Sequence, residues 1–181
     1  MFRWCTMIFE TEVMKETLLT IAEKMMLAAI TAPKGRGVDN IVAGMAFGED
    51  IRILSHKMKE LGQQKGADYF LRDSKNILLS EVIVLIGTKI NPLGLPDCGL
   101  CGMKDCGEKR KNPAHPCTFN TIDLGIAIGS AVSIAADNRV DNRIMNSVGV
   151  AAKELNMLGE DVKIIYGIPL SCSSKSPFFD R

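Results

Sequence analysis

The sequence predicts a single α+β domain whose helices and strands are interrupted by one long irregular loop. Three features predict it: stretches with apolar residues at helical spacing, short unbroken apolar runs, and four cysteines clustered in a proline-rich segment. The chain has 181 residues, of which 46% are hydrophobic and 24% are charged. This length and composition suit one folded domain that spans residues 1–181.

Five stretches favour helices, because each would bury one apolar face. The first has glutamates near its start, which suit the positive end of a helix dipole, and Pro33 ends it. The fourth follows a cap at Thr118 or Asn120 and is dense in glycine, alanine and serine, so we expect it to press against another backbone. The weakest pattern, over 70–79, favours a short helix. The expected helices cover residues 10–30, 50–61, 70–79, about 120–138 and 143–158.

Three short apolar runs predict strands. The run Val82–Ile86 is unbroken, which is typical of a strand buried on both faces. The expected strands cover residues 41–47, 81–88 and 162–168. Residues 91–117 contain four prolines and fit no regular element, so we expect them to form an inserted loop.

The inserted loop carries the clustered cysteines. Their spacing is Cys98-x2-Cys101-x4-Cys106-x10-Cys117, while Cys5 and Cys172 are isolated near the two ends of the chain. Clustered thiols in a reducing compartment more often bind a metal than form disulfides. Structural zinc prefers two Cys-x-x-Cys pairs, and only one is present; an iron–sulfur cluster accepts a compact three-cysteine loop with a distant fourth ligand. The spacing favours a [4Fe–4S] cluster, and zinc or unliganded thiols stay open as alternatives.

Charge and hydropathy exclude several classes of function. The sequence has 22 lysines and arginines against 21 aspartates and glutamates, so its net charge of +1 gives no basic surface for nucleic acid or an anionic membrane. Its longest uncharged apolar stretch, Leu124 to Ala136, has 13 residues, whereas a membrane-spanning helix needs about 20. No apolar run near the start has the length of a secretory signal. We therefore expect a cytoplasmic protein that binds neither nucleic acid nor membrane.

The remaining motifs allow two interpretations each. In Lys34-Gly35-Arg36-Gly37, glycine between two cations lets the backbone approach a phosphate, but a solvated basic turn has the same residues. The segment Ser173–Ser176 has the same character. Of the two histidines, His56 suits a surface or packing role, and His115 suits either a metal ligand or a surface-loop residue. A Ser–His–Asp triad is poorly supplied, so no catalytic residue is indicated.

The cysteine loop, together with Tyr69–Asn76 and Ile168–Leu170, resembles a prokaryotic family of unknown function described as containing a ferredoxin domain. The likeness spans nearly the whole chain, and the cysteine loop is its most specific part. It implies an iron–sulfur protein that acts in redox chemistry.

The order of elements also resembles half of the nitroreductase fold, a mixed sheet flanked by helices, whose members are flavin enzymes and usually homodimers. Ala28–Pro33 followed by Asn40 is similar to the segment that meets the flavin in those enzymes, and Lys175 falls near a basic position that meets the flavin phosphate. The sequence departs from nitroreductases in having no arginine between Arg3 and Arg36 and no Gln-Pro-Trp after the loop asparagine.

This second resemblance implies that FMN binds between subunits near Lys34, Arg36 and Asn40, with Lys175 closing the site from the C-terminal tail. We interpret the protein as an iron–sulfur redox protein and, in the fuller version, as an FMN-dependent reductase whose substrate the sequence does not indicate. A ferredoxin-like electron carrier without a substrate site and a zinc-clipped structural protein stay open as alternatives. The expected partners are a second copy, in a homodimer formed by the helix over 123–138, and a redox partner protein.

Overall fold

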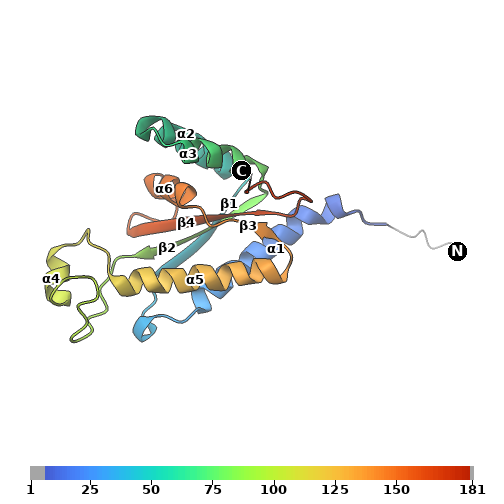
Figure 1. Ribbon diagram of the computed structural model, residues 1–181. Coiled ribbons are helices and arrows are strands. Elements are labelled where there is room, and N and C mark those ends of the chain that lie inside the picture. Colours follow the sequence, from blue (N-terminus) through green and yellow to red (C-terminus); the bar gives the residue numbers. More distant parts are fainter. Residues whose placement is uncertain (1–6, 180–181) are drawn as a thin grey trace.

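A four-stranded sheet with the strand order β1-β2-β4-β3 forms the centre of the computed structural model, which describes residues 7–179 (Figure 1). The strands are β1 (Ile41–Phe47), β2 (Val82–Lys89), β3 (Asp141–Asn142) and β4 (Val162–Ser171). Neighbouring strands pair antiparallel throughout. The expected mixed sheet is therefore wrong for the described residues. β1 and β2 are antiparallel because the chain leaves β1 and enters β2 at the same end of the sheet, where Phe47 pairs with Val82.

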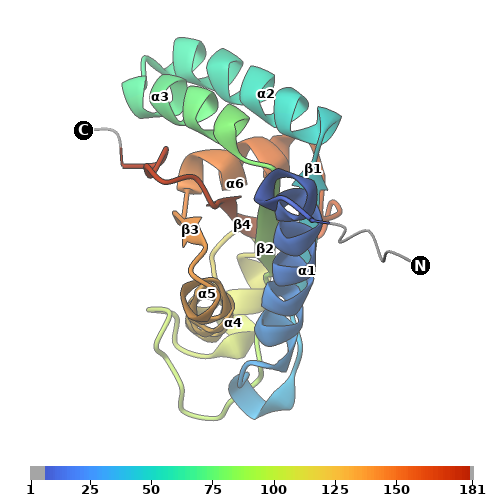
Figure 2. The same ribbon diagram turned by 90° about the vertical axis from the view of Figure 1, so that its right-hand side faces the viewer.

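Helices cover both faces of this sheet. α1 and α5 lie side by side on one face, and α2, α3 and α6 cover the other (Figures 1 and 2). The helices of the described range are α1 (Glu10–Thr31), α2 (Glu49–Lys65), α3 (Asp68–Asn76), α4 (Cys106–Lys111), α5 (Thr118–Asp137) and α6 (Asn146–Glu154). Two short 3-10 turns accompany them, η1 (Gly35–Gly37) and η2 (Ile77–Leu79).

The central strand β2 separates two hydrophobic cores. Its side chains at Val82, Val84 and Ile86 pack in the core that α1 and α5 share. Those at Ile83 and Leu85 pack in the core beneath α2, α3 and α6. Successive side chains of a strand point to opposite faces, so an unbroken apolar run suits this position. The prediction of a strand buried on both faces is confirmed.

The start of α6 differs from the sequence prediction. The helix expected over 143–158 begins only at Asn146, because the residues before it belong to the sheet. The backbone N–H of Met145 donates to the carbonyl of Gly167 at 2.8 Å, and the return hydrogen bond is 3.1 Å long. A strand partner that is distant in sequence therefore overrides the local helical pattern.

α5 and α6 use their glycines in opposite ways. A Cβ atom at Gly149 of α6 would lie 1.7 Å from the carbonyl oxygen of Ile165, so glycine lets α6 lie directly on β4. A Cβ atom at Gly125 or Gly129 of α5 would meet nothing within 4 Å. The expected close approach of the α5 glycines to another backbone is therefore not made within one chain. By length and composition alone α5 could also cross a membrane, although its buried face packs against α1 and β2.

Candidate functional site

The cysteine loop, residues 91–117, projects from one end of the sheet between β2 and α5 (Figure 1). It contains α4, so the expectation of an irregular segment throughout is wrong. Asp105 caps α4 by accepting a hydrogen bond from the backbone N–H of Glu108 at 2.8 Å. The Glu108 carboxylate in turn accepts one from the backbone N–H of Lys104 at 2.7 Å. The hydrogen bond from Glu108 is the largest cause that holds the pKa of Asp105 below its ordinary value.

Of the four clustered cysteines, Cys98 and Cys101 precede α4, Cys106 is its first residue, and Cys117 follows it. Cys98, Cys101 and Cys106 are half-buried, and Cys117, the residue before α5, is buried. Within residues 7–179, no group of three or more histidine, cysteine or acidic side chains is close enough to hold a metal ion. The structure thus places the predicted ligands in one loop but does not bring their sulfur atoms together.

The donor set of this loop fits a soft metal centre, because thiolates are the ligands that iron–sulfur clusters and zinc prefer. The backbone turns through the left-handed region at Asp97, Gly99 and Gly102, where φ is 54°, 56° and 82°. Residues 97–105 contain no helix or strand. The thiols of Cys98 and Cys101 could therefore turn toward Cys106 without the unfolding of any helix or strand.

His115 fastens the two arms of the loop to each other. Its Nε2 atom lies 2.8 Å from the carbonyl oxygen of Cys101, and since a carbonyl only accepts, the ring N–H donates. This contact gives His115 a structural role in the described arrangement. The same hydrogen bond holds the segment before α4 next to the segment after it.

The base of the cysteine loop is tied to the η1 turn, so the two regions singled out in the sequence meet. The guanidinium of Arg36 donates from Nη1 to the carbonyl oxygen of Leu93 at 3.0 Å. The backbone N–H of Gly35 lies 3.0 and 3.1 Å from the two carboxylate oxygens of Asp123 on α5. A Cβ atom at Gly35 would lie 2.6 Å from the end of the Leu93 side chain, so a larger residue would require Leu93 to move.

Two of the predicted flavin-binding residues have different surroundings. The side chain of Lys34 is 6% exposed and caps the end of α1, donating to the carbonyl oxygens of Ile30 and of Ala32 (2.9 Å). Asn40 is buried beside Asn91, whose Nδ2 atom donates to Asn40 Oδ1 at 3.4 Å. The Nδ2 atom of Asn40 has no hydrogen-bond partner among the described residues. Lys34 is thus occupied within the chain, while Asn40 keeps a free donor.

Lys175 lies at the other end of the sheet from these residues. The backbone N–H of Lys89, the last residue of β2, donates to the carbonyl of Asn40. The C-terminal tail follows Ser171, the last residue of β4, whose neighbour Leu170 pairs with Val82 at the start of β2. The length of β2 separates the two ends by about 23 Å, at ~3.3 Å per residue. Within one chain, the structure does not bring Lys175 to Lys34, Arg36 and Asn40.

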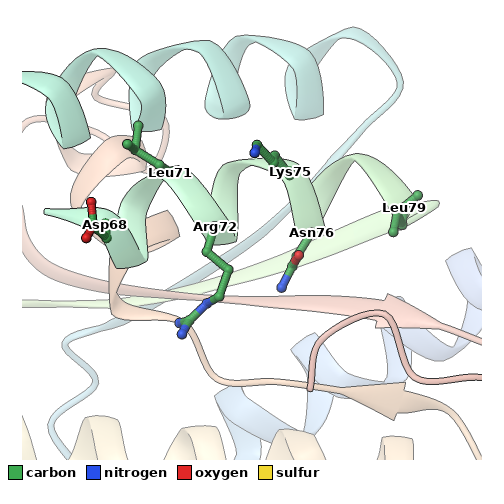
Figure 3. A pocket seen from close by; sticks show the side chains of 6 residues that line it. All are labelled: Asp68, Leu71, Arg72, Lys75, Asn76 and Leu79. Atoms are coloured by element: carbon green, nitrogen blue, oxygen red, sulfur yellow. The ribbon is translucent and has the colours of Figure 1, made fainter. Parts of the chain in front are cut away.

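Beside Lys175 the structure shows two adjoining cavities that the sequence analysis did not find. One has a volume of about 360 Å³ and is lined by Lys175, Asn76 and Leu79 with residues of the tail. The other, of about 620 Å³, shares Asn76 and Leu79 and is lined further by Arg72 and Lys75 of α3 (Figure 3). We call the two together the α3 cavity. Two cations, Arg72 and Lys75, and the Asp68 carboxylate therefore line the larger cavity, and Lys175 lines the adjoining one.

Buried polar groups shape the α3 cavity. Arg72 donates from Nε and Nη2 to one carboxylate oxygen of Asp73 at 2.9 and 2.8 Å, and the hydroxyl of Ser147 donates to the other at 2.6 Å. Asn76 is 7% exposed, and its Nδ2 atom has no partner among the described residues. Figure 3 shows the Arg72 and Asn76 side chains directed to the same side of α3. The sequence feature that could have indicated this cavity is the motif Tyr69–Asn76, because three polar residues of that helix are buried.

The fold defined by this sheet and its helices is that of nitroreductase-like α+β proteins. A nitroreductase with bound FMN from Bacteroides fragilis superposes with a TM-score of 0.60 at 12% identity, covering 86% of this chain and 77% of that one. A BluB-like flavoprotein from Clostridium difficile gives 0.54 at 21% identity, covering 86% and 84%. At these identities the likeness concerns the fold.

The chain belongs to the family of uncharacterized proteins containing a ferredoxin domain (DUF2148), whose model matches residues 114–181. An uncharacterized protein of Archaeoglobus fulgidus is 40% identical over 180 residues, which are 96% of this chain and 94% of that protein. The family resemblance inferred from the cysteine loop and from Tyr69–Asn76 is thereby confirmed.

Proposed function

We propose that the protein is a homodimeric iron–sulfur flavoprotein that reduces a small substrate, with a [4Fe–4S] cluster held by Cys98, Cys101, Cys106 and Cys117. The observation that carries the proposal is the contact between the η1 turn and the base of the cysteine loop, made by Arg36 and Leu93. When bound, the cluster exchanges single electrons and FMN combines them into two-electron reduction. The ferredoxin domain in the family description supports the cluster, and the FMN-bound relative in fold supports the flavin.

The α3 cavity supplies groups that fit the anionic part of FMN. A phosphate dianion needs cations and N–H donors around it. Arg72, Lys75 and Lys175 carry the charge, and the unpartnered Nδ2 of Asn76 is a buried donor without an acceptor. Asp73 and Ser147 hold Arg72 in place, since both oxygens of that carboxylate are bonded.

The η1 turn would complete the site from a second copy of the chain. Arg36 is exposed apart from its bond to Leu93, and Asn40 keeps a free amide donor. Lys175 lies at the opposite end of the sheet from Arg36 and Asn40 in the same chain. One flavin would therefore contact Lys175 of one subunit and the η1 turn of the other. The arrangement implied by the resemblance, with FMN between subunits, is consistent with this placement.

The exposed face of α5 is the surface we propose for the dimer. It presents Ile122, Gly125, Ile126 and Gly129 to solvent in the described structure. These residues recur at helical spacing, and a Cβ at either glycine has open space. In a symmetric dimer such a small-residue face packs on its own copy, where both helices approach closely. The expected approach of the α5 glycines to another backbone would then be made across the two-fold axis.

Anaerobic purification followed by iron, acid-labile sulfide, zinc and flavin analysis tests the proposed function. We expect iron, sulfide and FMN in the same preparation, which will be yellow-brown. Stoichiometric zinc in a colourless protein would overturn it in favour of the structural zinc clip. The matched control is the quadruple variant with Cys98, Cys101, Cys106 and Cys117 changed to serine, which should lose the metal and keep the fold.

A ferredoxin-like electron carrier is the second candidate. It is favoured by the surroundings of Lys34, whose ammonium is bonded to carbonyl oxygens at the end of α1 and lies 3.8 Å from the Asp39 carboxylate. Protein that holds iron and sulfide but binds no added FMN would support the carrier and overturn the reductase.

A further inference from the structure

The centre of the cysteine loop is a lysine. Leu93 and Cys117 are buried near the two ends of the described loop. Among the residues between them, only Lys109 is buried, with 2% of its surface exposed. The apolar residues of this stretch are half-buried or exposed, with Leu100 62% exposed. Small domains usually place an apolar side chain at such a point, and lysine is almost never fully buried unless it is paired.

The ammonium of Lys109 lacks a counter-charge in the described residues. Its Nζ atom has two long contacts, to the carbonyl oxygens of Asn112 at 3.4 Å and of Pro113 at 3.5 Å. It takes part in none of the ion pairs found between residues 7 and 179. The nearest acidic neighbours in sequence, Asp105 and Glu108, are exposed and accept backbone hydrogen bonds at the start of α4.

A buried cation without an anion is costly, so its position needs a partner of opposite charge. The loop has one source of buried negative charge, which is its thiols in the deprotonated form that binds metal. Cys106 begins the helical turn that ends at Lys109, and Cys98 and Cys101 are half-buried in the same loop. Four thiolates with an iron–sulfur core carry net negative charge, which increases when the cluster takes up an electron.

We propose that Lys109 compensates the negative charge of the cluster and so raises its reduction potential. The inference rests on the proposed function, because it needs a cluster in the loop. The physical basis is that a fixed cation in a low-dielectric surrounding stabilises the more negative, reduced form over the oxidised form. Lys109 is a tuning residue; it does not donate a ligand or transfer a proton.

The test compares three variants of the anaerobically purified full chain. Lys109→Met removes the charge and keeps a side chain of similar length, Lys109→Arg keeps the charge, and Lys111→Met removes an exposed charge from the same helix. The measurements are iron and sulfide per chain and the midpoint potential from an optical redox titration. We expect a lower midpoint potential in Lys109→Met and values close to wild type in the other two.

The possible outcomes separate the two proposals. An unchanged potential in Lys109→Met with full iron content would overturn the role of Lys109 and leave the proposed function standing. Loss of iron from Lys109→Met but not from Lys109→Arg would support the role, because Lys109→Arg keeps the positive charge that Lys109→Met removes. Loss of iron from both would overturn it, since shape would then matter more than charge. Wild-type protein without iron would overturn the proposed function and this inference together.

Discussion

The backbone N–H of Asn91 donates a 2.8 Å hydrogen bond to Oδ1 of Asn120, and this bond joins the two ends of the cysteine loop at its base. Asn91 follows β2, and Asn120 lies in the first turn of α5, three residues after Cys117. The bond therefore holds the chain that enters the loop beside the chain that leaves it, close to Cys117.

Replacing Asn120 with alanine should loosen the loop. The change removes the part-buried hydrogen bond from the N–H of Asn91, and a typical hydrogen bond contributes about 0.5–1.5 kcal/mol to stability. We expect a lower thermal midpoint and faster release of iron to a chelator. Thr121→Ala, one residue further along and exposed, is the control and should behave as wild type. Equal iron release from both variants would show that the bond does not hold the loop.

Replacing Cys101 with serine should abolish iron binding, because the cluster would lose one of its four thiolate ligands. Cys172→Ser should retain the metal, since Cys172 is exposed in the C-terminal tail. Cys5→Ser should retain it too; Cys5 lies outside the described residues. The measurement is iron per chain after anaerobic purification. Iron retained by Cys101→Ser and lost by either control would refute the ligand set.

Replacing Lys175 or Arg36 with alanine should weaken FMN without changing iron content. Each substitution removes one charge-assisted hydrogen bond to the phosphate region, so affinity should fall about tenfold to a hundredfold. The readout is an anaerobic flavin titration. Lys153→Ala, an exposed lysine of α6, serves as the control. If Arg36→Ala binds FMN as wild type does, the η1 turn does not belong to the site.

Replacing Gly149 with alanine should destabilise the fold. The new Cβ would overlap the Ile165 carbonyl oxygen at 1.7 Å, so α6 must shift away from β4, and overpacking of this kind costs about 1–3 kcal/mol or more. Urea unfolding followed by circular dichroism measures the change. Lys153→Ala on the exposed side of the same helix should stay within about 0.5 kcal/mol of wild type. A Gly149→Ala protein of wild-type stability would contradict the close packing of α6 on β4.

Placing leucine at Gly129 should break the proposed dimer. The side chain has room within one chain, since nothing lies within 4 Å of its Cβ position, but it would separate two copies of α5. Light scattering at micromolar concentration should give a dimer for wild type and a 19.8 kDa species for the variant. A single 19.8 kDa species for wild type would exclude the dimer.

The parts of the fold that local pattern determines could be predicted from the sequence. The apolar run of β2 and the stop at Pro33 are properties of the chain itself, and both agree with the structure. The start of α6 could not be predicted, because it depends on the pairing of Met145 with Gly167. The α3 cavity was missed for a related reason: that Asn76 lacks a partner is visible only once the tail lies beside α3.

β2 contributes side chains to both cores. If either layer of helices unfolded alone, it would expose one apolar face of β2 to solvent. The two layers should therefore melt as one cooperative unit, and the amide hydrogens of β2 should exchange with solvent only through global unfolding. The chain that leaves β2 enters the cysteine loop directly, so the loop is anchored at the strand that we expect to exchange most slowly.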